Sequence, residues 1–233
     1  MIGVKEAAEL LTSKGRKRQG RFLVEGQKLI DEALAAGYKL CGLWRAEEVG
    51  ERAFARLCDT VTPQGVAAAF ELPEERELTL APDGRYVLLE NLQNPGNVGS
   101  ILRTAEAMGL SGVLFCGEAV DIYAPKVLRG SMGSALRMPT CTFEAPDAAK
   151  AALAAAGLPL WGSALRADAV KLGGQSLTSG AVAVGNEGAG MSGELLELCD
   201  RVVVIPMAGV TESLSAPAAA AILLWELFGR NIF

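Results

Sequence analysis

The 233-residue sequence contains no histidine. A mechanism that depends on a histidine general base, or a metal site held by imidazole, is therefore excluded. Cysteine is scarce, and its five residues are scattered without a C-x-x-C pair: Cys41, Cys58, Cys116, Cys141 and Cys199. This spacing predicts neither a disulfide framework nor a metal site. We expect reduced cysteines in a cytoplasmic protein.

The sequence also lacks a hydrophobic run of membrane length. Its longest apolar run extends from Ala216 to Trp225, which is well short of the roughly 20 residues that a bilayer requires. Lys5, Glu6 and Glu9 interrupt the apolar pattern at the start of the chain, which the core of a secretory signal does not tolerate. We expect a soluble protein with no membrane partner.

Positive charge is in the minority but is locally concentrated. The chain has 22 Lys and Arg against 27 Asp and Glu, which gives a formal net charge of -5. This balance argues against a surface that binds nucleic acid throughout. One segment, KGRKRQGR, contains basic residues and no acid: Lys14, Arg16, Lys17, Arg18 and Arg21. The segment predicts contacts with phosphate groups, and its alternative interpretation is a solvated surface loop.

A change of pattern after Phe70 divides the chain. The stretch ELPEERELTLAPDGR is rich in acids and contains prolines and an Asp-Gly pair, which is typical of a linker. We predict a small N-terminal domain over residues 1–75, a linker over 76–85 and a second domain over 86–233.

In the second domain, apolar strands alternate with helices. The strands are YVLLE, GVLF, LWGSA, AVAVG and RVVVIPM, and the helical segments include SILRTAEAMG, APKVLRGSMGSAL and a last helix from about Ala216 to Phe228. Alternation of this kind predicts an α/β fold with a parallel sheet and with ligands at the carboxyl ends of the strands.

One glycine motif imitates a dinucleotide site. GAGMSG, from Gly188 to Gly193, matches G-x-G-x-x-G, follows an apolar strand and precedes a helix. However, Asn186 and Glu187 separate it from the strand, and the helix after it is very short. The sequence therefore favours another ligand over NAD.

Four turns occur in a fixed order: NPGNVGSILRTA, RGSMGSALRMP, VGNEGAGMS and VIPMAGVTESLS. With them the sequence resembles the SpoU (TrmH-type) family of RNA 2'-O-ribose methyltransferases, whose three motifs match residues 94–105, 185–192 and 205–220. The segments KGRKRQGRFLVEGQKLIDEAL and PQGVAAAF are similar to the small RNA-binding substrate domain that many members carry at the N-terminus. The resemblance covers nearly the whole chain.

The resemblance implies a fold, a partner and an activity. It implies a parallel-sheet SPOUT domain with a deep trefoil knot, preceded by a small α/β domain of the kind found in a ribosomal protein. It also implies a homodimer packed around the knot, S-adenosylmethionine as cofactor, and methyl transfer to a ribose 2'-hydroxyl of RNA, with 23S-type ribosomal RNA as the expected substrate. The alternatives are a catalytically silent RNA-binding or ribosome-assembly factor with the same fold, and a tRNA 2'-O-methyltransferase.

The same resemblance assigns site residues. The residues expected at the cofactor are Gly185, Ile205, Met207, Gly209 and Leu214, and those expected in catalysis are Asn97, Arg103, Glu187 and Ser213. Each has a simpler interpretation: the first five as ordinary loop residues, Arg103 as a solvated side chain, Glu187 as an acid near a helix start, and Ser213 as a turn or capping hydroxyl.

Arg103 follows Asn97 by six residues, or about 9 Å of helix rise. Helical side chains lean toward the N-terminus, so a long Arg side chain can reach back toward Asn97. The proton of the 2'-hydroxyl has three candidate acceptors, namely Glu187, an RNA phosphate and Arg103. A guanidinium is a poor acceptor, and we expect Arg103 mainly to fix a phosphate and stabilise the developing alkoxide.

The fourth turn departs from the family at Ser215, where an Asn usually follows Ser-Leu, and Ala216-Pro217 replaces Val-Ser. An Asn amide has more hydrogen-bonding groups than a hydroxyl, so we expect one polar interaction to be absent or bridged by water. Serine caps helices about as well as Asn, and proline suits a first turn. We therefore predict that Ser215 caps the terminal helix.

Overall fold

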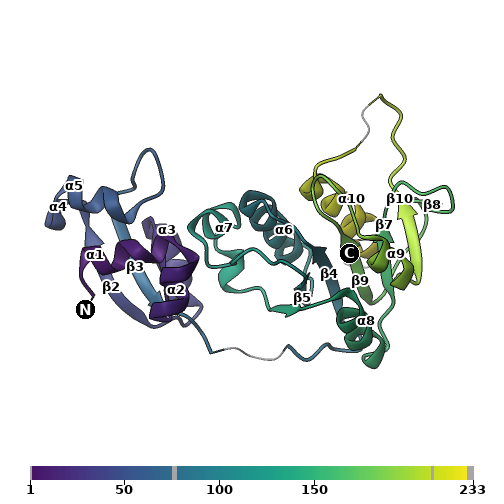
Figure 1. Cartoon of the computed structure of the whole chain (residues 1–233), viewed down its shortest axis with the longest axis horizontal. Helices are drawn as coiled ribbons and strands as arrows, with labels where there is room; N and C mark the ends of the chain where they lie inside the picture. Colours follow the sequence, from purple (N-terminus) through teal and green to yellow (C-terminus); the bar gives the residue numbers. More distant parts are fainter. Residues whose placement is uncertain (1, 75–77, 211–212, 230–233) are drawn as a thin grey trace. The chain divides into compact units, whose positions relative to one another are not determined.

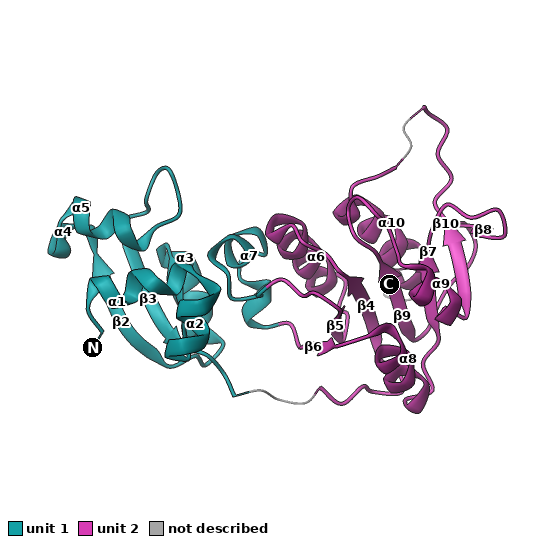
Figure 2. Ribbon diagram, in the orientation of Figure 1, with its two compact units in different colours: residues 1–76, 121–137 teal, residues 77–120, 138–233 magenta. Residues whose placement is uncertain are grey.

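The computed structural model of the chain describes residues 2–74, 78–210 and 213–229 (Figure 1). Contacts divide the chain into two compact units (Figure 2). Unit 1 comprises residues 1–76 and 121–137, and unit 2 comprises residues 77–120 and 138–233. By its contacts, segment 121–137 therefore belongs with the N-terminal residues, although the sequence division assigns it to the second domain. That division stays a prediction.

Unit 1 is built on a three-stranded antiparallel sheet in the order β1-β3-β2. Ala68 of the central strand lies in register between Val24 and Leu43 of its neighbours. The strands are β1 (Arg21–Glu25), β2 (Leu40–Arg45) and β3 (Val66–Glu71). The helices among residues 2–74 are α1 (Val4–Ala8), α2 (Ser13–Gln19), α3 (Gln27–Ala35), α4 (Ala46–Val49) and α5 (Glu51–Phe54), with 3-10 turns η1 (Glu9–Leu11) and η2 (Ala55–Leu57).

The basic run of the sequence is not a surface loop: its residues 14–19 belong to helix α2, and Arg21 begins strand β1. Thr12 begins the helix, because its Oγ1 accepts the N–H of Gly15 at 3.1 Å. Gly20 ends it with a φ of 61°, a left-handed conformation that glycine adopts without a steric penalty.

Segment 121–137 contributes helix α7 (Pro125–Gly130) and the 3-10 turn η3 (Ser134–Leu136). The sequence predicts one helix here, but Met132 and Gly133 have φ values of 53° and 89° and interrupt it. Tyr123 packs on Phe22 with ring centroids 4.9 Å apart. Three ion pairs also join the segment to the rest of unit 1: Arg16–Asp121, Arg129–Asp59 and Arg137–Glu32.

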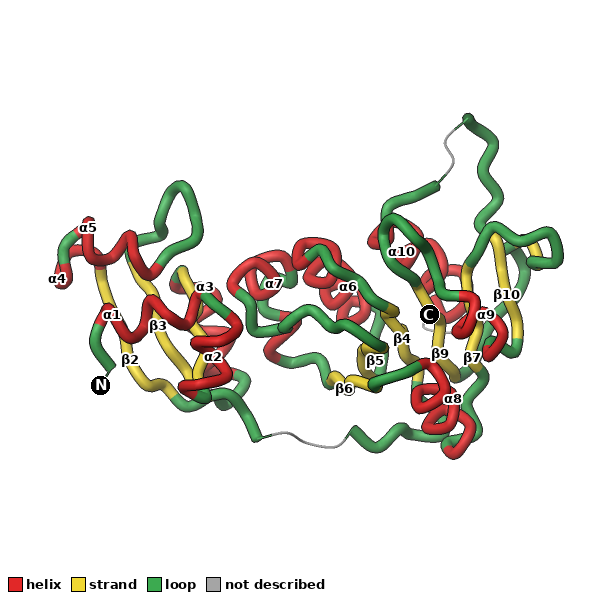
Figure 3. Tube along the Cα trace, viewed as in Figure 1, coloured by secondary structure: helices red, strands yellow, loops and turns green. Residues whose placement is uncertain are grey.

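Unit 2 contains a seven-stranded parallel sheet in the order β6-β5-β4-β9-β7-β10-β8 (Figure 3). The central strands β4 and β9 are almost entirely buried, as expected for apolar runs covered on both faces. The strands are β4 (Arg85–Glu90), β5 (Gly112–Cys116), β6 (Thr140–Phe143), β7 (Leu160–Ser163), β8 (Val170–Lys171), β9 (Gly180–Val184) and β10 (Arg201–Val204).

In the described part of unit 2, two pairs of helices cover this sheet, namely α8 with α9 and α6 with α10. Tyr86 and Leu88 of β4 share a core cluster with Leu153 of α8 and Leu195 of α9. Side chains alternate along a strand, so Val87 and the other intervening residues face the opposite side of the sheet. On that side α6 and α10 pack on each other. Helix α10 also packs on β4 and β9, and α6 packs on β5. The four helices are α6 (Pro95–Ala107), α8 (Pro146–Ala155), α9 (Gly193–Leu198) and α10 (Ala216–Phe228). The predicted α/β class is confirmed.

Candidate functional site

Two loops meet at the carboxyl ends of the central strands of unit 2. Leu89 near the end of β4 is in parallel register with Val184 at the end of β9. The chain continues from β4 into α6, and from β9 through residues 185–192 into α9. Both loops therefore leave the same edge of the sheet, where open α/β sheets bind ligands.

The first loop contains the NPGN turn that begins α6. Asn94 is the N-cap residue, and its Oδ1 accepts the N–H of Gly96 at 2.9 Å. Pro95 follows at the first helical position, where a missing N–H costs nothing. Asn94 and Pro95 therefore account for the helix start, and the side chain of Asn97 in the first turn serves another contact.

That contact is with Glu187 of the second loop. Glu187 Oε1 accepts a hydrogen bond from Asn97 Nδ2 at 2.9 Å and one from the N–H of Asn94 at 3.1 Å, and Oε2 accepts the N–H of Gln93 at 3.3 Å. Partial burial raises the pKa of Glu187, but these hydrogen bonds to the charged form outweigh burial and hold the pKa below its ordinary value. Glu187 thus connects the two loops as a carboxylate.

The second loop is a tight turn. Asn186 and Gly190 exchange backbone hydrogen bonds of 2.9 Å, and Asn186 Oδ1 accepts the N–H groups of Gly188 and Ala189. A Cβ on Gly185 would lie 2.2 Å from the backbone of Gly190. The need for glycine at position 185 therefore comes from the chain's own close approach, and no ligand is required to explain it.

A cavity of about 440 Å³ lies against this second loop. It brings together four of the five residues predicted at the cofactor, namely Gly185, Ile205, Met207 and Leu214, and two of those predicted in catalysis, Glu187 and Ser213. The other residues predicted for the cofactor and for catalysis do not line this cavity: Gly209, Asn97 and Arg103.

The cavity walls combine apolar and polar groups in comparable measure. Apolar side chains come from residues such as Val184, Met191 and Leu223, and polar ones from Ser163 and Arg166. Sequence reasoning missed the end of β7 and the loop that follows it, residues 163–166. The signal available in the sequence was that these residues end and follow the apolar strand LWGS, and ligands are expected at the carboxyl ends of such strands.

Arg103 lies on α6, exposed to solvent. It forms no hydrogen bond or ion pair with the residues that the structure describes, so all five of its N–H donors are available to a ligand. Arg103 forms no hydrogen bond with Asn97, whose side-chain amide donates to Glu187.

The prediction for Ser215 needs a correction. Ser215 occupies the N-cap position of α10, as expected, and Pro217 lies in the first turn. However, its side chain makes no capping hydrogen bond, and only its backbone C=O bonds, to the N–H of Ala219 at 2.9 Å. The hydroxyl is exposed and does not perform the predicted role.

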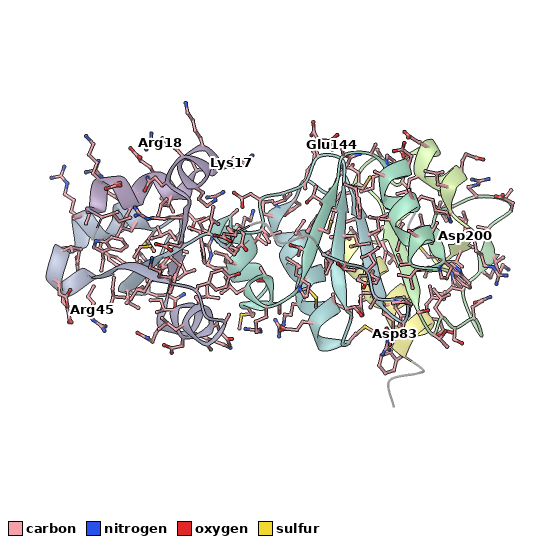
Figure 4. The ribbon with its side chains drawn as sticks, turned by 90° about the horizontal axis from the view of Figure 1, so that it is seen from below. Lys17, Arg18, Arg45, Asp83, Glu144 and Asp200 are labelled. Atoms are coloured by element: carbon pink, nitrogen blue, oxygen red, sulfur yellow. The ribbon has the colours of Figure 1, made fainter. Side chains whose placement is uncertain are left out.

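The five basic residues of unit 1 are not equivalent. Lys14 and Lys17 are exposed and form no ion pair within the described part of the chain, and Figure 4 shows Lys17 and Arg18 on the outside of unit 1. Arg18 forms an exposed ion pair with Glu9. Arg21 Nη1 lies 3.8 Å from an oxygen of Glu6, and the side chain of Arg21 is partly buried.

Arg16 corrects the interpretation of the run as RNA-binding throughout. Arg16 is only 3% exposed. Its Nε donates to Asp121 Oδ2 at 2.7 Å, and its Nη1 donates to the C=O of Leu10 at 2.7 Å. The guanidinium is used inside unit 1 and cannot contact a phosphate without breaking these bonds.

Comparison with known proteins agrees with this arrangement. Residues 84–225 match the profile of the SpoU rRNA Methylase family, and residues 3–51 match an MRM3-like substrate binding domain. The chain belongs to the SpoU rRNA methylase family. The resemblance predicted from the ordered turns is confirmed, and with it the enzyme class.

Two relatives align over most of their length. The 23S rRNA (guanosine(2553)-2'-O)-methyltransferase RlmP of Bacillus subtilis is 34% identical over 241 residues, which cover 97% of this chain and 96% of the relative. The 23S rRNA (uridine(2479)-2'-O)-methyltransferase of Streptomyces viridochromogenes is 31% identical over 252 residues, which cover 93% of this chain and 85% of the relative.

Solved structures share the fold. The SpoU methyltransferase AviRb from Streptomyces viridochromogenes in complex with AdoMet superposes with a TM-score of 0.83 at 30% identity, covering 96% of this chain and 95% of that chain. The AdoMet-bound rRNA methyltransferase from Sinorhizobium meliloti gives 0.86 at 29% identity, covering 96% and 92%. These neighbours agree with the predicted cofactor.

Two absences hold for the described residues. None of their helices is long and apolar enough to cross a membrane. Within the same residues, no group of three or more His, Cys, Asp or Glu side chains is arranged to hold a metal ion.

Proposed function

We propose that this protein transfers a methyl group from S-adenosylmethionine to a ribose 2'-hydroxyl of 23S-type ribosomal RNA. One observation carries the proposal: Glu187 lines the cavity and also holds Asn97 of the NPGN turn at 2.9 Å. A cofactor cavity and a second ligand-binding turn are thereby fixed to each other, as a two-substrate transfer requires. The names of the relatives, both 23S rRNA 2'-O-methyltransferases, supply the substrate.

The cavity suits S-adenosylmethionine. Its volume lies in the range of small-molecule sites, and its walls combine apolar side chains with polar groups. Apolar side chains such as Ile205, Met207 and Leu214 would hold an adenine ring, and the backbone of residues 185–191 would supply polar groups to the cofactor. When bound, the cofactor supplies an electrophilic methyl group on a sulfonium. Calorimetric titration should therefore show saturable binding of S-adenosylmethionine and none of NAD.

We assign the RNA side to Asn97 and Arg103. Asn97 lies in the first turn of α6, and its side-chain amide is held by Glu187, so the orientation of this amide is set before RNA binds. Arg103 has a free planar fork of donors that matches a phosphate. From this position its charge stabilises the developing alkoxide, and Ser213, at the cavity wall, orients the reacting groups.

The hydrogen bonds of Glu187 bear on the identity of the proton acceptor. Hydrogen bonds that hold the pKa of a carboxylate down also make it a weaker base. We therefore assign Glu187 to orientation and not to proton abstraction. The guanidinium of Arg103 is a poor acceptor as well, and we assign it to binding a phosphate and stabilising the developing alkoxide.

RNA binding is extended to unit 1. We propose that residues 1–75 form the substrate domain and that Lys14, Lys17, Arg18 and Arg21 contact phosphates, whereas Arg16 does not. The match of residues 3–51 to a substrate binding domain supports this assignment. Phosphate contacts supply affinity and register but no sequence reading.

Three further properties follow from family membership as proposals. They are a trefoil knot in the methyltransferase part, a homodimer packed around it, and a cytoplasmic location with the ribosomal RNA. Light scattering of the purified protein tests the dimer, and a monomer at micromolar concentration would contradict it.

The experiment that tests the activity compares ribosomal RNA from cells with and without the gene. Mass spectrometry of RNA fragments should locate one ribose methyl group on 23S-type RNA that is lost with the gene and restored by the purified protein and S-adenosylmethionine. Methylation of tRNA alone would contradict the substrate. RNA binding without methyl transfer would favour a silent assembly factor.

A further inference from the structure

A buried acid links strand β4 to the loop that lines the cavity. Glu90, the last residue of β4, is 2% exposed, and both of its carboxylate oxygens accept hydrogen bonds from one residue. Oε1 lies 2.5 Å from Ser192 Oγ, and Oε2 lies 2.7 Å from the backbone N of Ser192. No Lys or Arg of the described segments forms an ion pair with Glu90. Burying a charge is costly, and two charge-assisted hydrogen bonds offset that cost here.

Ser192 lies at the junction between the cavity and helix α9. Its Oγ donates to Glu90 and accepts the N–H of Leu195 at 3.1 Å, which makes Ser192 the side-chain cap of the helix. The preceding residue, Met191, is buried and lines the cavity. A displacement of Ser192 would therefore move a wall of the cavity.

The other end of the same loop, at Asn186, is hydrogen-bonded to Asn91, the residue that follows Glu90. The C=O of Asn91 accepts a hydrogen bond from Asn186 Nδ2 at 2.8 Å. Asn91 has a φ of 50°, and its side chain stabilises this left-handed conformation by accepting the N–H of Glu118 at 2.9 Å. Both ends of segment 186–192 are thus fastened to two consecutive residues at the carboxyl end of β4.

We infer that Glu90 is a positioning residue for the cofactor: by holding Ser192, it keeps the loop of residues 185–192 in its binding shape before the cofactor arrives. The inference rests on the proposed function, because it takes S-adenosylmethionine as the ligand of this cavity. A loop that is already ordered loses less conformational freedom on binding. Glu90 does not line the cavity. At saturating cofactor the bound ligand itself holds the loop, Glu187 included, so the effect of Glu90 falls on cofactor affinity and not on the methyl transfer step.

The variant that tests this is Glu90→Gln, which keeps the size of the side chain but turns one acceptor into a donor. We expect the Kd for S-adenosylmethionine, measured by calorimetry, to rise about tenfold, which corresponds to about 1.4 kcal/mol. The KM for S-adenosylmethionine should rise similarly, while kcat at saturating cofactor and the KM for RNA stay within about twofold of wild type. Glu194→Gln, an exposed acid in the first turn of α9, is the matched control and should change neither constant.

An unchanged Kd in folded Glu90→Gln would overturn the inference. If that variant does not fold, as judged by circular dichroism, Ser192→Thr and Ser192→Val decide, because the two side chains have nearly the same shape and only Thr keeps the hydroxyl. We expect Ser192→Thr to bind the cofactor more tightly than Ser192→Val by about tenfold. Equal affinities of the two would overturn the inference, whereas a wild-type protein that binds no S-adenosylmethionine would contradict the proposed function itself.

Discussion

Glu187 accepts a hydrogen bond from Asn97 at 2.9 Å, across 90 residues of sequence. Removing the carboxylate charge should release the NPGN turn from the cavity loop. We predict that Glu187→Gln lowers kcat about tenfold, because hydrogen bonds to charged groups are stronger than neutral ones and this one is partly exposed. Single-turnover methylation of RNA measures this effect.

The control is Glu118→Gln, because Glu118 is an exposed acid whose side chain forms no hydrogen bond with the described residues. In a double-mutant cycle, Asn97→Ala should cost less in the Glu187→Gln background than in wild type. Strictly additive losses would mean that the two residues act independently.

The same hydrogen bond predicts a pH dependence of stability. The pKa of Glu187 is lower in the folded protein than its ordinary value, so this group stabilises the fold above the unfolded pKa, about 4.3. That stabilisation is lost as the pH falls through the folded pKa. The Tm difference between wild type and Glu187→Gln should be constant near neutral pH and shrink below about pH 4. A difference that grows on acidification contradicts the assignment.

Arg103→Ala should slow methyl transfer by about 10²–10³-fold, the usual cost of removing one electrostatic interaction with a developing oxyanion. Cofactor affinity should stay within a few-fold, since Arg103 does not line the cavity. Arg103→Lys keeps the charge but loses the planar fork, and we expect it to recover only part of the rate. Methylation by Arg103→Ala at the wild-type rate would make Arg103 a surface residue.

The sequence predicts the parallel sheet because apolar strands that alternate with helices are a local pattern. Ile205, Met207 and Leu214 are assigned to the cofactor by the family resemblance and not by this pattern, and all three line the cavity. The contacts of Arg16 were not predictable, because its partner Asp121 lies 105 residues away and a basic run looks the same whether its residues are solvated or buried. Glu90 was hidden for the same reason, since its partner Ser192 is 102 residues distant.

Burial separates two roles within the basic run. Lys14→Ala with Lys17→Ala should weaken RNA binding and reduce the slope of log K against log salt by about 0.7–0.9 for each phosphate that the variant no longer binds, with stability unchanged. Arg16→Ala should instead lower stability by about 1–3 kcal/mol, between the values typical of exposed and of fully buried pairs, because it leaves Asp121 without its partner. Denaturant titration and salt-dependent RNA binding, measured on both variants, distinguish the two effects. An unaltered salt slope in the lysine variant would mean that these side chains are only solvated.

Helix caps give a comparison within one chain. Ser192 and Thr12 both accept a backbone N–H through their side chains, whereas Ser215 occupies an N-cap position without such a bond. Replacing a working cap by Ala costs about 0.5–2 kcal/mol. We therefore predict a loss in that range for Thr12→Ala, and a loss below about 0.5 kcal/mol for Ser215→Ala, since the exposed hydroxyl of Ser215 leaves no partner unsatisfied.

Activity separates a cap from a ligand-binding group at position 215. The family usually carries Asn here, and an amide can both donate and accept at this edge of the cavity. Because the side chain of Ser215 makes no hydrogen bond with the residues that the structure describes, Ser215→Asn should fold like wild type. If it also leaves the KM for S-adenosylmethionine unchanged, the interaction that the family's Asn makes is dispensable in this protein. A gain of activity from a wild-type protein that binds RNA and cofactor but transfers no methyl group would instead mean that the serine has silenced the site.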